Sequence, residues 1–565
     1  MAKVISIGNQ SFESIREKDN FYIDKTNFIR EWWDNDDTVT LITRPRRFGK
    51  TLNMSMLECF FSNKYKDRGD LFEGLEIWND EKYRKLQGTY PVIFLSFAKI
   101  KQNTYEGAVK QIKNELINLY NAFDYIVKSD LYNENEKLQY KSIRVGMDDE
   151  TAQDALNNLS NYLSRYYGKK VIILLDEYDT PMQEAYVNGY WEELVAFTRS
   201  LFNSTFKTNP YLERAIMTGI TRVSKESIFS DLNNLKVITV TSDEYSKCFG
   251  FTEDEVFAAL DEQGLSSEKE KVKLWYDGFT FGDEKDVYNP WSIINFLDEK
   301  KYKTYWADSS SNGLVNELIR TGSAEIKKTM ETLIAGGTVE KNIDEQIVFE
   351  QLKTNKDAVW SLLLASGYLR VETFRTEGRL NKKIYSLKLT NYEVEQMFGT
   401  MIERWFGGAD VPYNEFINAM LNGDIESMNE YMNRVTRGVI SYFDTGKTPS
   451  DEEPERFYHG LVLGLMVEQV DNYILNSNRE SGYGRYDIML EPIDKTNEKY
   501  PGIVIEFKVI NPRKENTLEE TVAAALKQIE EKNYDAELIK RGVKEENIHH
   551  YGFAFRGKEV LIDGR

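Results

Sequence analysis

Short, largely apolar runs alternate with longer segments of helical periodicity along the first half of the chain. The runs read LIT, PVIFLSFAKI, VIILLDEYD and RAIMTGITRV, at residues 41–43, 91–100, 171–179 and 214–223. The segments between them, above all residues 104–167, repeat their apolar positions at the period of a helix. Apolar strands of this length are typical of a parallel sheet that is buried on both faces. The pattern therefore predicts an α/β domain with a central parallel sheet.

The pattern changes after residue 250. Helical segments lead to the block VWSLLLASGYLRVE and to a β pair that ends at IYSLKLTN. This order predicts a helix, a turn and a hairpin, as in a small winged helix. Amphipathic helices with heptad-like spacing follow, and the turn-forming run TGKTPSDEEPE after them is typical of a linker. Beyond it, FYHGLVLGLMVEQVDNYIL has helical periodicity, SNRESGYGRYDIML is typical of a hairpin and GIVIEFKVI of a strand.

We therefore expect four parts, since 565 residues are too many for a single core. They are a parallel-sheet domain, a helical lid with a small winged-helix-like part, a helical connector and a C-terminal α/β domain, over residues 1–245, 246–390, 391–450 and 451–565. ATPase lids and DNA-binding modules share the winged-helix shape, so this shape alone assigns no function.

Charge and cysteine content narrow the choice of partners and compartment. The net charge of −20 means that a nucleic-acid site would need a local basic groove. Cys59 and Cys248 cannot form a disulfide framework and have no metal-ligand spacing, which fits a reducing cytoplasm. The N-terminal residues lack the apolar core of a signal peptide, and no apolar run has the length of a membrane span. We expect a cytoplasmic protein without a membrane partner.

Residues 41–52, LITRPRRFGKTL, combine an apolar strand, a basic turn and Gly49-Lys50-Thr51 ahead of a helical run. A triphosphate site needs this arrangement. Main-chain N–H groups and the positive helix N-terminus hold phosphate oxygens, the lysine reaches the β- and γ-phosphates, and the hydroxyl holds Mg²⁺. Arg44 stands where the general motif has its first glycine, which usually permits a left-handed turn. An ordinary basic turn is the alternative.

The run 171–179 leads from five apolar residues directly into Asp176-Glu177. Acidic residues at the carboxyl end of a buried strand face the ligand crevice of an α/β nucleotide-binding domain. Asp176 would hold Mg²⁺, usually through water, and Glu177 would polarise the attacking water. The alternative is a strand that ends in solvated acids. We favour the nucleotide-site interpretation only because the phosphate-loop candidate precedes this strand in the sequence.

The next apolar run carries Thr218, Thr221 and Arg222 at and beyond its end. These residues could sense the γ-phosphate, with Arg222 as a phosphate-facing arginine. A strand cap followed by a surface arginine fits the same pattern.

Several separated sequence blocks of the first 300 residues resemble those of a known family. FYIDKTNFI, LITRPRRFGKT, VIILLDEYDTP, AIMTGITRVSKESIFSDLNNL and LWYDGFTF…VYNPWSIINFL resemble, in this order, the AAA-ATPase-like domain of bacteria and archaea over roughly residues 5–300. That family has an RPRRFGKT/S loop in place of the usual phosphate loop. The resemblance implies ATP binding by Lys50 and Thr51, with Asp176 and Glu177 as the acidic pair. The candidate ATP- and Mg²⁺-binding residues are thus Arg46, Arg47, Gly49, Lys50, Thr51, Asp176, Thr218 and Arg222.

The strand GIVIEFKVI carries a second candidate site. Glu506 and Lys508 interrupt an apolar frame at alternate positions, so both side chains leave the same face. An aligned Asp487 on the neighbouring strand would bring two carboxylates and an ammonium to one point. Two carboxylates suit a hard divalent cation, and the lysine would assist the metal-bound water or stabilise the pentavalent phosphorus. Alternating charges on a strand are common, but charges on a buried strand are costly unless they are paired or bind metal.

The blocks FYHGLVLGL, SNRESGYGRYDIML, IVIEFKV, AALKQIEEKNY and YGFAFRGKEV resemble the PD-(D/E)XK nuclease domain, over about residues 455–563. The resemblance implies that Asp487 and Glu506 bind the metal and that Lys508 is catalytic, with Tyr486 in place of the motif's proline. Gln528 and Tyr534 match an element that contacts substrate or supports the active site. His459 matches a metal-binding helical histidine, although a buried core histidine fits as well. Glu468 and Glu480 are weaker candidates, and the pair His549-His550 is expected in a polar surface turn.

The combined hypothesis is a hydrolase in which a P-loop ATPase domain with a lid precedes a restriction-endonuclease-like α/β domain. We expect ATP and Mg²⁺, with Mn²⁺ possible at the nuclease site, and nucleic acid, in particular DNA, as substrate. A phosphate-facing Arg222 that acts between subunits would predict a homo-oligomer. Two alternatives stay open: a nucleotide-switched interaction protein with a silent nuclease fold, and a DNA-binding regulator, against which the acidic balance argues.

Overall fold

The computed structural model divides into two compact units, which we describe separately. The first comprises Met1–Leu314 and Glu340–Val394, and the second Val315–Val339 and Glu395–Arg565. The structure describes residues 3–207, 209–221, 228–229, 231–307, 315, 318–319, 324–334, 336–343, 358–378, 382–406, 414–439, 472–477, 480–481, 484–485, 487–510, 515–556 and 559–565.

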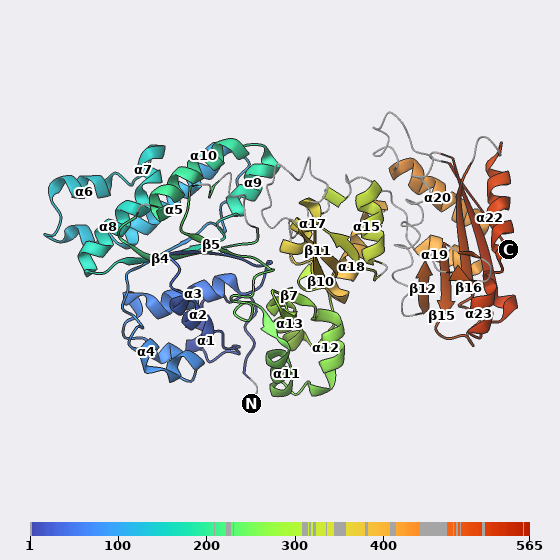
Figure 1. Ribbon diagram of the computed structural model, residues 1–565, viewed down its shortest axis with the longest axis horizontal. Helices are drawn as coiled ribbons and strands as arrows, with labels where there is room; N and C mark the ends of the chain where they lie inside the picture. Colours follow the sequence, from blue (N-terminus) through green and yellow to red (C-terminus); the bar gives the residue numbers. More distant parts are fainter. Residues whose placement is uncertain are drawn as a thin grey trace. The chain divides into compact units, whose positions relative to one another are not determined.

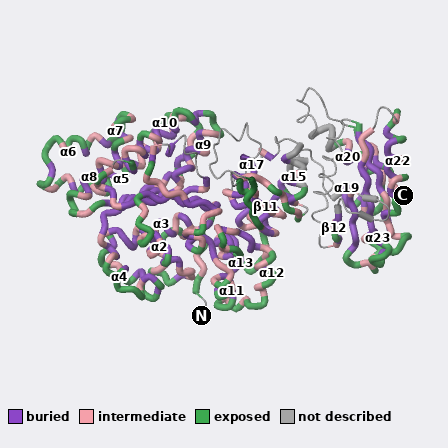
Figure 2. Tube along the Cα trace, in the orientation of Figure 1, coloured by how far each residue is buried: buried purple, intermediate pink, exposed green. Residues whose placement is uncertain are grey.

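A five-stranded parallel sheet with the order β2-β3-β4-β1-β5 forms the centre of the first unit (Figure 1). The predicted α/β fold with a parallel sheet is therefore confirmed. Strands β1 and β3 are buried along their whole length, as their apolar runs predict (Figure 2). The order places β4 between β1 and β3, so the carboxyl ends of these three strands are neighbours. The strands are β1 Val39–Thr43, β2 Val92–Ser96, β3 Val171–Asp176, β4 Leu212–Gly219 and β5 Leu235–Ile238.

Helices cover both faces of this sheet (Figure 1). On one face, α3 packs its methionines and phenylalanines against β1, β3 and β4, together with α1 and α2. On the other face lie the longer helices α5, α8 and α10 (Figure 1). The bounds are α1 Phe12–Glu17, α2 Asn27–Asn35, α3 Lys50–Phe61, α4 Glu81–Arg84, α5 Tyr105–Ala122, α6 Glu134–Lys141, α7 Asp149–Gln153, α8 Ala155–Tyr167, α9 Thr180–Asn188 and α10 Trp191–Phe202.

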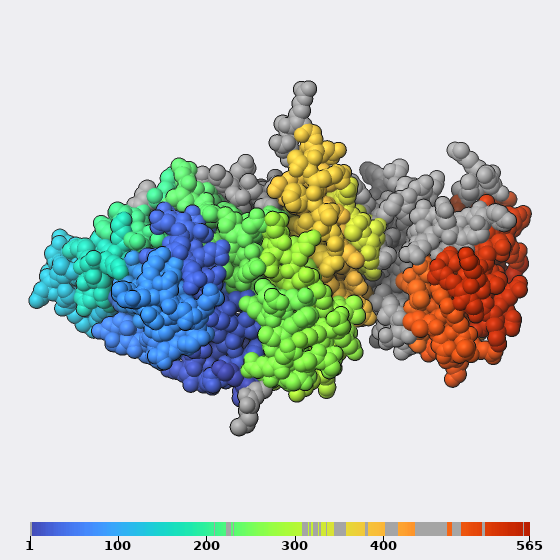
Figure 3. Space-filling model, turned by 60° about the horizontal axis from the view of Figure 1, so that its bottom comes forward, coloured from blue at the N-terminus to red at the C-terminus, as the bar shows by residue number. Residues whose placement is uncertain are grey.

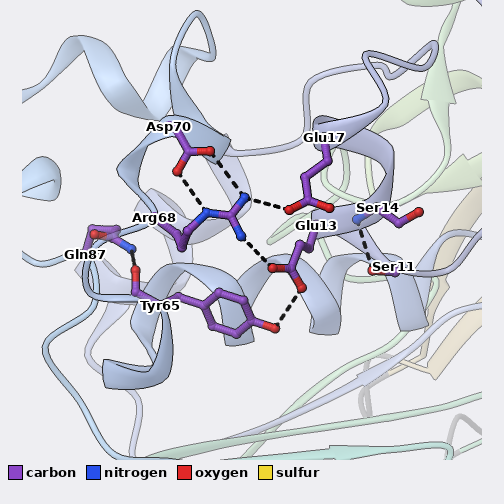
Figure 4. Close-up of polar contacts among 8 residues, drawn as sticks. All are labelled: Ser11, Glu13, Ser14, Glu17, Tyr65, Arg68, Asp70 and Gln87. Atoms are coloured by element: carbon purple, nitrogen blue, oxygen red, sulfur yellow. Dashed lines mark hydrogen bonds and ion pairs between the residues drawn. The ribbon is translucent and has the colours of Figure 1, made fainter.

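The short helix α1 is fastened to the segment after α3 by one arginine (Figure 4). Arg68 contacts Glu13 at 2.7 Å, Glu17 at 2.9 Å and Asp70 at 3.0 Å. All four side chains are at least 30% exposed, so each pair adds little free energy and the network chiefly sets the position of α1.

The lid packs directly against the parallel-sheet domain (Figure 3, green against blue). Its first part is a small antiparallel sheet, β6-β8-β7, with helices α11 to α13 around it. Its second part is the predicted helix followed by a hairpin, which is confirmed as α17, β10 and β11. The bounds are β6 Phe251–Thr252, α11 Glu253–Glu262, α12 Lys269–Tyr276, β7 Phe279–Phe281, β8 Glu284–Tyr288, α13 Pro290–Glu299, β9 Val339–Lys341, α17 Ala358–Ala365, β10 Leu369–Glu377, β11 Lys382–Leu389 and α18 Tyr392–Phe406. The helix between α13 and β9, α15 Ala324–Ile334, belongs to the second unit.

The second unit contains a mixed five-stranded sheet with the order β12-β15-β16-β17-β18, in which only β16 and β17 pair in parallel among the described strands. The strands alternate between two cores. Odd-numbered positions of β16 face α19 and α20, and even-numbered positions face α22. The bounds are α19 Asn414–Asn422, α20 Ile425–Val439, β12 Tyr473–Ser477, β13 Glu480–Ser481, β14 Gly484–Arg485, β15 Ile488–Pro492, β16 Gly502–Val509, α22 Leu518–Lys532, α23 Asp535–Lys540, β17 Ile548–Arg556 and β18 Glu559–Gly564.

Two expectations for this region need correction. The helices expected to form a connector, α19 and α20, instead cover one face of the second sheet, where Phe416, Met420 and Met432 pack beside Ile505 and Phe507. The apolar stripe that suggested a packed connector is thus buried by strands that follow it in the chain. The end of the helix expected in FYHGLVLGLMVEQVDNYIL is also different, since its last three residues begin β12, where they pair with β15. The rest of that segment lies outside the described residues.

Candidate nucleotide and nuclease sites

The phosphate-loop candidate is a tight turn between β1 and α3. Gly49 caps α3 with a left-handed φ of 77°, and Arg47 is left-handed as well at 66°. The Lys50 ammonium donates to the carbonyl oxygens of Arg44 at 2.9 Å and Pro45 at 2.8 Å. Burial lowers the pKa of Lys50, against the opposing effect of nearby carboxylates. The loop therefore encloses its own lysine.

Arg44 explains why this loop can lack the motif's first glycine. Its φ is not among the positive values found in the described residues, so no left-handed turn is needed there. The side chain is fully buried and donates to the carbonyl oxygens of Thr43 at 3.0 Å and Thr239 at 2.7 Å. The guanidinium also lies 4.5 Å from the ring of Phe281. Burial lowers its pKa to about 10. Arg44 thus joins the loop to the segment after β5.

The other two arginines of the loop lie closer to its surface. Arg46 is half-buried and donates to the Gln183 side-chain oxygen on α9, at 3.3 Å. Arg47 is exposed, and its guanidinium lies 4.3 Å from the ring of Trp291, at the start of α13. Both predicted phosphate-binding arginines therefore border the loop on its solvent side, one toward α9 and the other toward the lid.

Four predicted residues meet at the carboxyl ends of β3 and β4. The Asp176 carboxylate accepts hydrogen bonds from the hydroxyls of Thr51, at 2.7 Å, and Thr218. The N–H of Glu177 points to the Thr218 hydroxyl at 3.4 Å, and Glu177 has a left-handed φ of 51°. Burial raises the pKa of Asp176, while the two threonine hydrogen bonds oppose the rise. A buried carboxylate beside a hydroxyl is a hard oxygen set, so Thr51 and Asp176 fit a Mg²⁺ ion.

Asp179 is a residue of this site that the sequence argument did not single out. One carboxylate oxygen accepts from the N–H groups of Ile220 and Thr221, both at 2.9 Å, and from Gln183 at 3.0 Å. Burial raises its pKa. Asp179 begins α9 without capping its N–H groups, because the turn after β4 uses its carboxylate instead. The sequence did contain an indication of this role: Asp179 is the third acid in VIILLDEYD and stands directly before the Thr-Pro pair that begins a helix. Arg222, the next residue in the sequence, lies outside the described residues.

The nuclease candidates meet between β15, β16 and α22. β15 and β16 are antiparallel with Ile488 opposite Ile505, so one step further along this register Asp487 lies opposite Glu506. The Asp487 carboxylate accepts the N–H of Phe507 at 2.8 Å. This contact confirms the expected alignment of Asp487 with the strand that carries Glu506 and Lys508.

A hydrogen-bonded cluster joins the rest of the site. Lys508 donates to the Gln528 side-chain oxygen at 2.7 Å and lies 4.0 Å from Glu506. The Gln528 amide nitrogen donates to the Glu506 carboxylate and, at 3.2 Å, to the Tyr534 hydroxyl. Burial raises the pKa of Tyr534, and the charges of Glu506 and Asp487 add to the rise. Gln528 and Tyr534 therefore contact the buried carboxylate and the lysine directly.

The donor set fits a divalent cation. Glu506 is only 4% exposed, and a buried carboxylate opposite a second one has the oxygen chemistry that Mg²⁺ or Mn²⁺ requires. The described residues contain no cluster of three or more His, Cys, Asp or Glu side chains in a metal-binding arrangement. His459 and Glu468 lie outside the described residues, and for Glu480 only the backbone of β13 is described. A third protein ligand is thus unassigned.

The pair His549-His550, expected in a surface turn, lies in β17 instead. His550 contacts Asp535 at 2.7 Å and His549 contacts the Tyr551 hydroxyl at 3.1 Å. The apolar run YGFAF follows the pair and belongs to the same strand, which begins before the two histidines. The polar character of the histidines themselves gave no indication of a strand.

Comparison with known proteins supports both resemblances. Residues 6–229 match the family described as "Predicted AAA-ATPase", and residues 453–564 match the PD-(D/E)XK nuclease superfamily. The chain is also 25% identical over 396 residues to a protein of Azotobacter chroococcum mcd 1 named "Uncharacterized protein in vnfD 5'region". That similarity covers 70% of this chain and 68% of the other protein. Within the described parts of the chain, no helix is both long and apolar enough to span a bilayer.

Proposed function

We propose that the AAA-ATPase-like domain binds Mg·ATP and thereby controls phosphodiester cleavage of nucleic acid, most simply DNA, by the PD-(D/E)XK domain that follows it. The observation that carries the proposal is the cluster of Asp487, Glu506, Lys508 and Gln528, in which a buried carboxylate and a lysine share one amide. Buried charges of this kind are costly for stability, so a chemical role is the simplest reason for their presence.

The residues of the nucleotide site have separable roles in this proposal. Lys50 would exchange its two carbonyl partners for the β- and γ-phosphates, whose charged oxygens are stronger acceptors. Thr51 and Asp176 would hold Mg²⁺, which neutralises the phosphates when bound. Glu177 would orient the attacking water, with Thr218 fixing its main chain.

The nuclease residues divide the work in a similar way. Asp487 and Glu506 would hold the divalent cation, which supplies a Lewis acid for the phosphate when bound. Lys508 would stabilise the charge that develops on the phosphorus oxygens. Gln528 keeps the lysine and Glu506 in register, and Tyr534 positions Gln528.

The test is cleavage of linear and circular DNA, single- and double-stranded, in Mg²⁺ or Mn²⁺, with and without ATP. RNA substrates run in parallel, and Lys508→Ala is the inactive control. We expect cleavage that Lys508→Ala abolishes and that ATP changes. Absence of cleavage on every substrate would transfer the assignment to a nucleotide-switched interaction protein whose nuclease fold is silent. Cleavage that ATP leaves unchanged would retain the nuclease and remove the proposed control.

A further inference from the structure

One main-chain carbonyl of the phosphate-binding loop is held by the lid. The Arg46 oxygen accepts the indole N–H of Trp306 at 3.0 Å and the side-chain N–H of Asn289 at 3.3 Å. Asn289 is also the N-cap of α13, since its side-chain oxygen accepts the N–H of Trp291 at 2.8 Å. Two lid residues, Trp306 and Asn289, therefore hydrogen-bond to the same carbonyl oxygen of the loop.

Aromatic packing makes this contact stiff. Phe48 of the loop lies edge-on to Phe279, with ring centroids 4.8 Å apart. Phe279 lies in the same way against Trp306, at 5.4 Å. All three rings are at most 2% exposed. Tightly packed side chains change between discrete arrangements instead of deforming continuously, so a shift of the loop must move Trp306 or break its contacts.

The main chain of Trp306 continues the connection to a buried acid. The Glu393 carboxylate accepts the N–H of Trp306 at 2.6 Å, the N–H of Ala307 at 3.4 Å and the hydroxyl of Ser292 at 2.8 Å. Glu393 is fully buried. A buried carboxylate that loses one of these donors is no longer compensated for the loss of water around it, which is costly. We therefore expect the three hydrogen bonds to Glu393 to be kept or broken together.

Glu393 is the second residue of α18, which runs without interruption from Tyr392 to Phe406. The first compact unit ends at Val394, so the helix that Glu393 anchors belongs to both units. The second of these units carries the nuclease candidates. The contacts from Arg46 through Trp306 to Glu393 thus connect the phosphate-binding loop with the start of α18, one of the points at which the chain passes from one unit to the other.

We infer that the contact between Trp306 and Glu393 couples nucleotide occupancy of the phosphate-binding loop to the nuclease unit. Phosphate binding requires Lys50 to leave the carbonyl oxygens of Arg44 and Pro45, and the adjacent Arg46 carbonyl moves with them. Trp306 transfers that movement to the Glu393 carboxylate and so to the first turn of α18. The inference rests on the proposed function, because it names the route by which ATP controls cleavage.

Thermodynamic reciprocity provides a test that does not require turnover. If ATP changes the affinity for DNA by some factor, DNA must change the affinity for ATP by the same factor. We would measure the dissociation constant of ATP in Mg²⁺, with and without a DNA duplex. The full-length chain carries Lys508→Ala throughout, so that the DNA stays intact. In this background we expect DNA to shift the ATP dissociation constant by about fivefold or more, the lower end of typical allosteric coupling.

Two further substitutions address the contact itself. Trp306→Phe removes the indole N–H and retains a ring beside Phe279, and Glu393→Gln retains the shape and removes the charge. Each should leave ATP binding without DNA within about threefold of the background and reduce the DNA-induced shift to less than about twofold, as expected when a coupling contact is lost. Trp78→Phe is the matched control, since Trp78 packs on Phe72 outside the loop, and it should retain the full shift. Thermal unfolding identifies a variant that fails to fold, and the other variant then carries the test.

The outcomes separate the inference from the proposed function. A full DNA-induced shift in both folded variants overturns the inference and leaves ATP control intact. No shift in the Lys508→Ala background overturns ATP control, and the inference with it. A shift that is lost in Trp306→Phe or Glu393→Gln and retained in Trp78→Phe supports both.

Discussion

The nucleotide site and the nuclease site use similar side chains on different frameworks. The nucleotide site joins the ends of three parallel strands that are far apart in the sequence. Asp176 accepts hydrogen bonds from threonine hydroxyls, and Asp179 accepts them from main-chain N–H groups. The nuclease site uses two adjacent antiparallel strands and one helix, all between residues 487 and 534. Side chains of the first site therefore also hold the fold together, whereas those of the second chiefly contact one another.

The largest effect that we expect is a loss of cleavage activity that leaves ATP binding intact. Lys508→Ala should reduce cleavage by about a thousandfold or more, because it removes the charge that stabilises the reacting phosphate. Binding of ATP in the absence of DNA should stay unchanged. Both are measured on one preparation, by product formation and by calorimetric titration of Mg·ATP. Equal loss of both would show that the two sites do not act separately.

The complementary change is Lys50→Ala. It should weaken ATP binding by about a hundredfold, since a charge-assisted hydrogen bond from a buried ammonium is worth about 1.5–3 kcal/mol and the loop also loses its internal anchor. Cleavage without ATP should remain, and its response to ATP should disappear. Lys64→Ala, at an exposed lysine after α3, is the matched control. ATP-independent cleavage that fell together with binding would contradict the separation of roles.

Asp179→Asn addresses the double role of the nucleotide site. The amide oxygen of Asn can still accept the N–H groups of Ile220 and Thr221, but without the carboxylate charge both become neutral hydrogen bonds, at a cost of about 1–3 kcal/mol. We expect ATP turnover to fall about tenfold or more and the thermal midpoint of unfolding to decrease. Gln183→Ala removes the contact to Arg46 and one hydrogen bond to Asp179, but it leaves the carboxylate and its two main-chain donors in place, so it should have the smaller effect. Unchanged turnover in Asp179→Asn would show that the turn after β4 needs no such support.

A smaller effect on cleavage is expected from a substitution that supports the nuclease site indirectly. Tyr534→Phe removes the hydroxyl that accepts from Gln528, a neutral hydrogen bond worth about 1 kcal/mol. Cleavage should therefore fall about fivefold at saturating metal. Stability should change little, because the buried ring remains. A loss as large as that of Lys508→Ala would assign Tyr534 a direct role in the chemistry.

The smallest effect concerns pH and the lid. Burial, with the neighbouring Asp286, raises the pKa of Asp277 to about 7. The folded state therefore binds the proton more tightly than the unfolded state, whose aspartate pKa is about 3.9. The contribution of Asp277 to stability is fully present below that pKa and is lost as pH rises toward 7. Asp277→Asn should flatten this decline and raise stability at pH 8 by about 1 kcal/mol relative to the wild type.

Guanidinium titrations at pH 5, 6, 7 and 8 measure this difference, and Asp283→Asn, at an exposed neighbour, is the control. A steeper pH dependence in Asp277→Asn would contradict the assignment. The prediction also distinguishes the two sites, because Asp277 lies two residues before the lid strand β7, whose Phe279 packs on Phe48 of the phosphate-loop candidate. Nuclease activity without ATP should not follow this titration.

Most of the candidate site residues could be proposed from the sequence, because each stands at a recognisable place in a local pattern. Lys50 and Thr51 begin a helix, Asp176 ends an apolar strand, and Glu506 and Lys508 alternate within one. A period of two or 3.6 residues places such side chains on a face without any knowledge of the rest of the fold. The register of two neighbouring antiparallel strands then brought Asp487 opposite Glu506, as expected.

The sequence by itself thus determined the α/β class, the motifs and most of the candidate site residues, since these follow from local periodicity and side-chain type. Tertiary structure alone decided that Arg44 is buried under Phe281, that Asp179 holds the turn after β4, and that Glu393 meets the main chain of Trp306. It also decided that α19 and α20 belong to the second sheet. The physical reason is that an apolar stripe or a buried charge specifies that a partner is needed, whereas strand order and packing specify which partner it is.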